Sequence, residues 1–345
     1  MIGESKGKDE AFPFSTNSNE AVPAVHIESL RKVYLVNRQE GGARATLRSL
    51  VRRRREEISA VDGISFELAT GEIVGFLGPN GAGKTTTLKM LSGLLHPTSG
   101  EATVLGHIPW KREKSFLQQI TLVMGQRNQL VWDIPALNSF ELNRAIYRIP
   151  EDDYRHMIRE LTELLELEPI LHKPVRNLSL GERMKCEIAA ALLHRPKVVF
   201  LDEPTIGLDV TMQHRIRTFI AEYNRRFQAT VLLTSHYMAD VEALCKRVVI
   251  IHQGKLLFDG ELAKLVQKFT AHKTIIVQVG DCENNLASYG KVVSCVGGRY
   301  TLRVPKDKTA HITERLLADL PVIDLLVADP PIEEVIQRIF AQEKL

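Results

Sequence analysis

The chain has 345 residues, enough to bury an α/β core and a second small domain. Its 45 Lys and Arg residues nearly balance its 42 Asp and Glu residues, so bulk charge gives no argument for a nucleic-acid partner. The four cysteines form no C-x-x-C pair, which argues against a disulfide scaffold or a zinc site. No apolar run approaches the roughly 20 residues that span a bilayer, so we expect a soluble chain whose membrane crossing, if any, belongs to another subunit.

The first part of the chain is polar and basic. Residues 1–22 lack periodicity and predict a disordered tail, and residues 25–30 predict the first strand. A basic insertion at about 37–58, with four arginines at 52–55, then interrupts the expected hairpin. Two interpretations stay open for these arginines: a solvated helix face, or contact with anionic lipid headgroups.

Residues 78–85 match the phosphate-loop pattern G-x-x-x-x-G-K-[ST]. Residues 72–77 predict a buried strand before it, and 86–95 predict a helix after it. Glycines let backbone N–H groups point inward around phosphate oxygens, and the helix start adds partial positive charge. Lys84 is expected to reach the β/γ-phosphates and Thr85 to bind Mg²⁺. The predicted nucleotide-binding residues are Gly78, Pro79, Asn80, Gly81, Ala82, Gly83, Lys84, Thr85 and Thr86.

A long helical tract at 139–171 predicts a helical subdomain over about 127–180. Near its end, Ser179 and Glu182 form an S-x-x-E capping box before an apolar helix. The same helix start offers a serine hydroxyl and the Gly181 N–H group to a γ-phosphate.

Residues 198–201 are apolar and lead directly into Asp202 and Glu203. This pattern predicts a buried strand that delivers two carboxylates to the ligand-binding edge of a parallel sheet. Asp202 is expected to hold Mg²⁺ through a water, and Glu203 to polarise the water that attacks the γ-phosphate.

In this order the motifs resemble the ATP-binding subunit of ABC transporters, over about residues 24–262. The family signature LSGGQ reads LSLGE here, with Leu180 in place of a glycine. The resemblance implies ATP hydrolysis with ATP and Mg²⁺. It adds four residues: Gln126 as the glutamine loop that touches Mg²⁺ and the attacking water, His236 at the γ-phosphate, Asp209 in the loop that crosses the dimer, and Tyr34 stacked on adenine.

The expected fold is therefore an α/β phosphate-loop NTPase core of the ABC ATPase type at 23–265, followed by a small C-terminal α+β domain at 266–345. Strands are predicted there at 274–279, 291–293, 300–304 and 322–327, with helices at 312–318 and after 330. This domain carries no catalytic cluster. Ordinary packing and a dimerising or regulatory role both stay open for it.

The resemblance also implies partners. Two subunits of this family, identical or paired, face head to tail, so Ser179, Gly181, Glu182 and Asp209 would serve the partner's nucleotide. The insertion and the motif wording resemble a subgroup that pairs with separate ABC-2-type permeases, among them drug exporters. This predicts a cytoplasmic subunit bound at the inner-membrane surface. Residues 132–135 then predict either a groove for a permease segment or ordinary subdomain packing.

Two other classes of phosphate-loop protein are alternatives to a transport ATPase. A soluble ABC ATPase acting on ribosomes should carry two nucleotide domains, and one acting on DNA should carry long coiled coils, but the sequence has neither. A GTPase should carry an N-K-x-D guanine motif, which is absent, and a kinase would not need the LSLGE helix. No nucleic-acid partner is expected.

Overall fold

The computed structural model describes residues 22–37, 55–125, 129–269, 272–280 and 286–342. Three predicted features lie wholly or mostly outside the described residues: positions 1–21 of the tail predicted at 1–22, positions 38–54 of the basic insertion predicted at about 37–58, and Gln126 of the glutamine loop.

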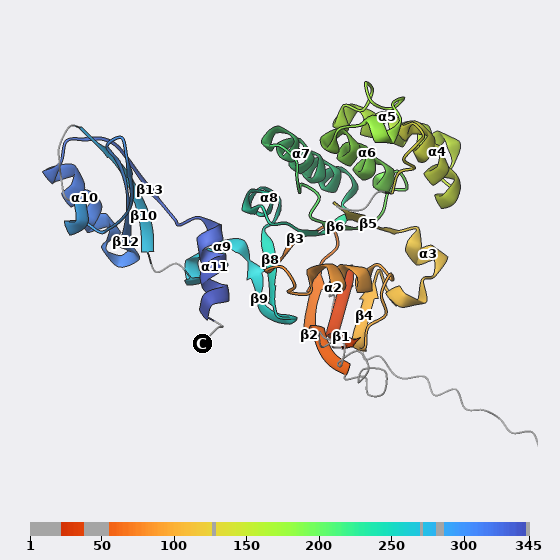
Figure 1. The fold of residues 1–345 in the computed structure, drawn as a ribbon, viewed down its shortest axis with the longest axis horizontal. Coiled ribbons are helices and arrows are strands. Elements are labelled where there is room, and N and C mark those ends of the chain that lie inside the picture. Colours follow the sequence, from red (N-terminus) through yellow and green to blue (C-terminus); the bar gives the residue numbers. More distant parts are fainter. Residues whose placement is uncertain (1–21, 38–54, 126–128, 270–271, 281–285, 343–345) are drawn as a thin grey trace, which may run out of the picture.

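A six-stranded sheet forms the centre of the ATPase part (Figure 1). Its first five strands in spatial order are parallel, and the sixth pairs antiparallel with the fifth through a hairpin at Gln253 and Gly254. The strands, in spatial order, are β5 (Ile120–Met124), β6 (Val198–Asp202), β7 (Thr230–Thr234), β3 (Ile73–Leu77), β8 (Arg247–His252) and β9 (Lys255–Glu261).

Both faces of this sheet are covered, as its continuous apolar strands require. Along β6, Val199 and Leu201 enter one hydrophobic core with α6 (Leu180–Leu192) and α7 (Val210–Phe227). Val198 and Phe200 alternate with them and enter a second core with α2 (Lys84–Leu91). Because all five β6 residues are buried, the strand end that carries Asp202 is fixed from both sides.

A three-stranded antiparallel sheet lies against α2 in the order β2 (Arg55–Leu68), β1 (Val25–Asn37) and β4 (Ser99–Val104). β1 and β2 extend from both sides into the predicted insertion. Glu56 and Glu57 therefore lie exposed on a strand, so the helix face considered for the arginines at 52–55 does not continue into these two residues.

The helical subdomain is made of two helices where the sequence predicts one long tract. α4 (Ala136–Tyr147) ends at Arg148, whose φ of 55° is left-handed, and Pro150 precedes α5 (Glu151–Leu165). A left-handed residue breaks the helical hydrogen-bond ladder, and proline favours a new helix start. α4, α5 and α6 lie together on one side of the sheet in Figure 1, and α3 (Lys114–Leu117) connects toward β5.

The C-terminal region forms a separate four-stranded antiparallel sheet, with α10 (Thr309–Asp319) packed on one face through Ile312 and Leu316. The order of strands and helices predicted for this region is confirmed. The strands, in spatial order, are β11 (Lys291–Val296), β12 (Arg299–Pro305), β10 (His272–Val279) and β13 (Val322–Ala328).

The last helix, α11 (Ile332–Gln342), departs from the predicted domain boundary. Its apolar residues Val335, Ile336 and Ile339 join the core of the ATPase part, where α11 contacts α9 (Leu262–Phe269). Figure 1 shows these two helices side by side between the six-stranded central sheet and the C-terminal sheet. The C-terminal sheet is thus flanked in sequence by a helix pair that anchors on the ATPase core.

None of the helices in the described ranges is long and apolar enough to cross a membrane.

Candidate active site

The phosphate loop connects β3 to α2 and is shaped by glycines that no other residue could replace. A Cβ atom on Gly83 would lie 2.3 Å from the carbonyl oxygen of Ala60, and its φ of 107° is left-handed. A Cβ atom on Gly78 would lie 2.3 Å from the carbonyl oxygen of Ile251. The loop is also held from behind, because Gly254 N–H donates to the carbonyl of Ala82 at 3.0 Å.

Lys84 begins α2 and is almost fully buried. Its ammonium donates to the carbonyl oxygens of Gly78 at 2.6 Å and Pro79 at 3.1 Å, so it lies folded over the loop. Burial lowers the pKa of Lys84, while the carboxylates of Glu203 and Asp202 act in the opposite direction. The ammonium is therefore held by two backbone carbonyl oxygens, with two carboxylates near enough to influence it electrostatically.

Asp202 ends β6 and receives two hydroxyl groups. Thr85 donates to its Oδ2 at 2.8 Å, and Thr234, at the end of the neighbouring β7, donates to its Oδ1 at 2.7 Å. Thr234 was missed by the sequence reasoning. The sequence feature that could have identified it is a threonine at the end of the strand that follows β6 in the chain. The two strands are paired, and their register sets Thr234 opposite Asp202.

Glu203 follows in a left-handed conformation, with a φ of 56°. Its backbone N–H lies 3.0 Å from the Thr234 hydroxyl, and its Oε1 lies 2.7 Å from Nε2 of His236. A non-glycine residue in this region is strained and is often found at functional sites. Glu203, Thr205, Ser235 and His236 all line one cavity of 240 Å³.

The signature residues form a second group. The predicted capping box is present: Glu182 N–H donates to the Ser179 hydroxyl at 3.2 Å, and Ser179 N–H donates to the Glu182 carboxylate at 2.8 Å. The Ser179 N–H group holds the pKa of Glu182 below its usual value. Leu180 replaces the family glycine without disturbing this helix start.

Asp209 caps the neighbouring helix α7, accepting a hydrogen bond from Met212 N–H at 2.9 Å. A Cβ atom on Gly181 would lie 3.2 Å from the Met212 side chain, so the starts of α6 and α7 are in contact. Ser179 and Asp209 are both exposed there. The predicted site residues therefore divide into a phosphate-loop group and an exposed signature group.

Tyr34 is half-exposed on β1, opposite Ile58 and with the Lys32 ammonium 5.4 Å from its ring centre. Ile58 belongs to β2, and two residues further along this strand the carbonyl of Ala60 lies against Gly83 of the phosphate loop. Tyr34 therefore lies on the pair of strands, β1 and β2, that flanks the loop. Gln126 lies outside the described residues.

The residues on each side of positions 126–128, Gly125 and Gln129, are held by hydrogen bonds to other segments. Gly125 N–H donates to the carbonyl of Asp202 at 3.0 Å. Gln129 N–H donates at 2.8 Å to the carboxylate of Glu187, which lies on the signature helix α6. Burial raises the pKa of this Glu187 carboxyl group. Glu187 is a second residue that the sequence reasoning missed, because a helical pattern does not predict that a carboxylate will accept a hydrogen bond from a distant segment.

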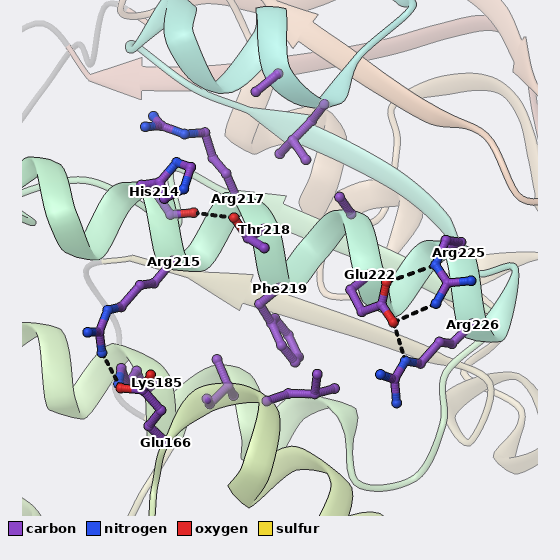
Figure 2. Close-up of a pocket in the computed structure, with 15 residues that line it drawn as sticks. Glu166, Lys185, His214, Arg215, Arg217, Thr218, Phe219, Glu222, Arg225 and Arg226 are labelled. Carbon is purple, nitrogen blue, oxygen red and sulfur yellow. Dashed lines mark hydrogen bonds and ion pairs between the residues drawn. The ribbon is translucent and has the colours of Figure 1, made fainter.

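A larger cavity of 730 Å³ runs along α7, away from the phosphate loop (Figure 2). Its charged groups mostly pair within it: Glu222 accepts from Arg225 and Arg226, and Arg215 donates to Glu166. Figure 2 shows Arg217 pointing to the opposite side of α7 from Arg215 and Glu166.

Comparisons with known proteins find matches to both parts of the chain. Residues 61–206 match the family described as "ABC transporter", and residues 271–328 match "EvrA-like ABC transporter, C-terminal domain". The "ABC transporter ATP-binding protein NatA" of Bacillus subtilis (strain 168) is 35% identical over 214 residues, 62% of this chain and 87% of that protein. The "Nod factor export ATP-binding protein I" of Burkholderia pseudomallei (strain 1710b) is 34% identical over 63% of this chain and 71% of that protein. The "Bacitracin transport ATP-binding protein BcrA" of Bacillus licheniformis is 36% identical over 57% of this chain and 63% of that protein.

Among solved structures, the "Structure of ATP binding subunit of ABC transporter" covers 71% of this chain and 93% of its own, with a TM-score of 0.59. At 24% identity this likeness shows the fold, and it confirms the predicted α/β class. The coverage and identity of the first relative show the family: this chain belongs to the ABC transporter ATP-binding proteins and is an ATP hydrolase of the ABC type.

Proposed function

We propose that two copies of this chain, or this chain and a paired ATPase subunit, close around two ATP molecules and drive export through separate ABC-2-type permease subunits. The observation that carries the hydrolytic site is the convergence of Thr85, Asp202, Glu203 and His236 at one edge of the central sheet. In this proposal the chain works at the cytoplasmic face of the inner membrane.

The phosphate loop, residues 78–86, would bind the triphosphate through the backbone N–H groups of its residues other than Pro79. Lys84 would turn from the loop carbonyls to the β/γ-phosphates, exchanging two neutral acceptors for charged ones. Tyr34 would stack on the adenine from the flanking strand pair.

Mg²⁺ fits the donors that this edge offers. The Thr85 hydroxyl and the Asp202 carboxylate already meet at 2.8 Å, and both are the hard oxygen ligands that Mg²⁺ prefers. A phosphate-loop site needs few protein ligands, because the phosphates and waters supply the others. When bound, the ion would neutralise charge on the β- and γ-phosphates. Thr85, Asp202 and Gln126 would hold it, Asp202 through a water.

Glu203 would accept the proton of the water that attacks the γ-phosphate. Its carboxylate stands one residue beyond Asp202, which places a base next to the site of the metal and phosphate. His236, now 2.7 Å from Glu203 Oε1, would contact the γ-phosphate when ATP is present. Their present pairing keeps both side chains beside the same 240 Å³ cavity.

Dimerisation is supported by the division of the site residues into two groups. Ser179 and Asp209 are exposed at adjoining helix N-termini, where partial positive charge favours a phosphate. Two copies related by a two-fold axis would each present this signature group, with Gly181 and Glu182, to the phosphate loop of the other.

A permease site is supported by exposed apolar groups beside the glutamine loop. A cavity of 600 Å³ is lined by Leu94, Ile146 and Gln129, and Leu94 and Ile146 are exposed. Trp132 is also partly exposed, at 45%, whereas Phe140 is fully buried. Phe140 thus serves subdomain packing, and Trp132 is available to a partner.

Export is supported by the relatives' names, which include Nod factor export, bacitracin transport and linearmycin resistance. The direction and the ABC-2 type of the permease remain part of the proposal. The basic insertion would lie near the anionic headgroups in this arrangement.

Reconstitution with the permease tests this function. The full chain, co-expressed with a candidate multi-span permease, should copurify with it, and the complex should hydrolyse ATP faster than the chain alone. Ile146→Arg should abolish copurification, because it replaces an exposed apolar side chain with a charge that the interface would bury. Leu317→Arg, on an equally exposed position of α10, is the matched control. Stimulation by ribosomes or DNA and not by any permease would favour the soluble alternative instead.

A further inference from the structure

Asp240, on α8 (Met238–Leu244), is a buried carboxylate that none of the predicted roles uses. It is 1% exposed and receives three donors. The hydroxyls of Thr205 and Ser235 donate to its Oδ2 at 2.5 Å and 2.6 Å, and Arg217 donates to its Oδ1 at 2.8 Å. Each donor comes from a different segment of the chain.

Two of these segments carry the proposed catalytic pair. Thr205 lies two residues after Glu203, and Ser235 lies directly before His236. Both hydroxyl-bearing residues line the same 240 Å³ cavity as Glu203 and His236. Asp240 therefore joins, through one carboxylate oxygen, the loop after β6 to the loop after β7.

The third donor is a guanidinium, which pairs with the other carboxylate oxygen of Asp240. Arg217 comes from the middle of α7, and its side chain is 12% exposed. Its side chain points to the other side of α7 from Arg215 and Glu166 (Figure 2), and it donates to Asp240 on α8. A buried carboxylate is tolerated only when it is paired and hydrogen-bonded, so Arg217 is what permits Asp240 to accept both hydroxyls.

We propose that Asp240, fixed in place by Arg217, is a positioning residue for ATP hydrolysis. It clamps the two loops so that Glu203 and His236 stay within 2.7 Å of each other across the cavity. This inference rests on the catalytic roles proposed for Glu203 and His236. Its physical basis is that a general base displaced by about 1 Å loses roughly 100-fold in rate.

Single hydroxyl deletions test the clamp without leaving a buried charge unpaired. Thr205→Val and Ser235→Ala in the full chain should each lower kcat for ATP by roughly tenfold or more, with the KM for ATP and the nucleotide affinity within about twofold of the wild type. Because both hydroxyls act through one oxygen, the double variant should lose less than the product of the two single losses.

Arg217→Met should lower kcat in the same way, and Arg217→Lys should recover most of the loss by restoring a cation. The matched control is Arg215→Met, on the same helix, whose partner Glu166 lies on the other side of α7. That control should keep the wild-type kcat. Melting temperatures measured for every variant separate positioning from unfolding.

Two results would overturn the inference. One is an unchanged kcat in Thr205→Val and Arg217→Met. The other is a parallel loss of kcat, ATP affinity and melting temperature in all variants, which would mean that the cluster only supports the fold. Hydrolysis by Glu203→Gln at the wild-type rate would instead refute the catalytic proposal itself, so the two failures are distinguishable.

Discussion

The Thr85 hydroxyl donates a 2.8 Å hydrogen bond to Oδ2 of Asp202, although 117 residues separate the two in the chain. The other carboxylate oxygen accepts the hydroxyl of Thr234 at 2.7 Å. Asp202 is therefore oriented from both sides before any ligand binds. Outer-shell hydrogen bonds of this kind tune the affinity of a carboxylate for a metal ion.

Thr234→Val should weaken Mg²⁺ binding, because it removes the hydrogen bond that orients Asp202. We expect a roughly 10- to 100-fold higher Mg²⁺ concentration for half-maximal ATP hydrolysis. Thr230→Val, on the same strand but bonded to Gly71, is the control for lost stability. An identical Mg²⁺ titration for both variants would show that Thr234 has no part in the metal site.

Glu203→Gln should keep ATP binding and abolish turnover, since an amide cannot take a proton from the attacking water. A loss of about 10²- to 10⁴-fold in kcat is expected for a general base. The variant should also accumulate as a dimer with MgATP, which size-exclusion chromatography would detect. A monomer under these conditions would contradict the two-fold arrangement, even if turnover were lost.

Lys84→Met should lower ATP affinity by roughly 10- to 100-fold, the amount expected for losing hydrogen bonds to a charged phosphate. The variant removes a buried cation from between the loop carbonyls and keeps the apolar stem. Lys89→Met, one turn further along α2, should bind ATP normally. Fluorescent nucleotide titration measures both, and equal affinities would remove Lys84 from the site.

Ser179→Ala should cost about 1 kcal/mol of unfolding free energy, the usual value for a lost N-cap. Glu182→Gln should cost less, because glutamine also fits the third position of a capping box. The substitution gives up only the partly exposed contact with Lys173 at 3.6 Å. Denaturant unfolding compares the two, and a larger loss in Glu182→Gln would mean that its charge matters more than the box.

The local elements of the site could be predicted from the sequence because their causes are local. The strand before the phosphate loop, the acids that end β6 and the capping box at Ser179 all depend on residues within a few positions of one another. Each has a pattern whose physical reason is complete within that window. The same is true of the strand and helix order of the C-terminal region.

What could not be predicted depends on segments that meet only in the folded chain. Thr205, Arg217, Ser235 and Asp240 converge because β6 and β7 are parallel neighbours, and no spacing in the sequence encodes that. The helix after residue 330 was predicted, but not the core that its apolar residues join. The break between α4 and α5 did carry a signal, Pro150, which the helical periodicity on each side concealed.

Acid should destabilise the protein partly through His194. Its ring is stacked on Tyr147 with centres 3.9 Å apart, Nε2 donates to the carbonyl of Ile120 at 3.0 Å, and Nδ1 has no hydrogen-bond partner among the described residues. Burial lowers its pKa to about 4. The unfolded chain, with a histidine pKa near 6.5, therefore binds the proton first as the pH falls.

The contribution of neutral His194 to the free energy of unfolding is fully present above pH 6.5, and it is lost progressively as the pH falls from 6.5 to 4. For one such group the unfolding free energy should drop by about 2 kcal/mol between pH 7 and pH 5. His194→Phe keeps the stacking, loses the Ile120 bond at every pH, and should show a smaller drop by that amount. His172→Gln, at an exposed histidine, should keep the wild-type slope. If the unfolding free energies of His194→Phe and the wild type fell equally with pH, groups other than His194 would be responsible for the acid sensitivity.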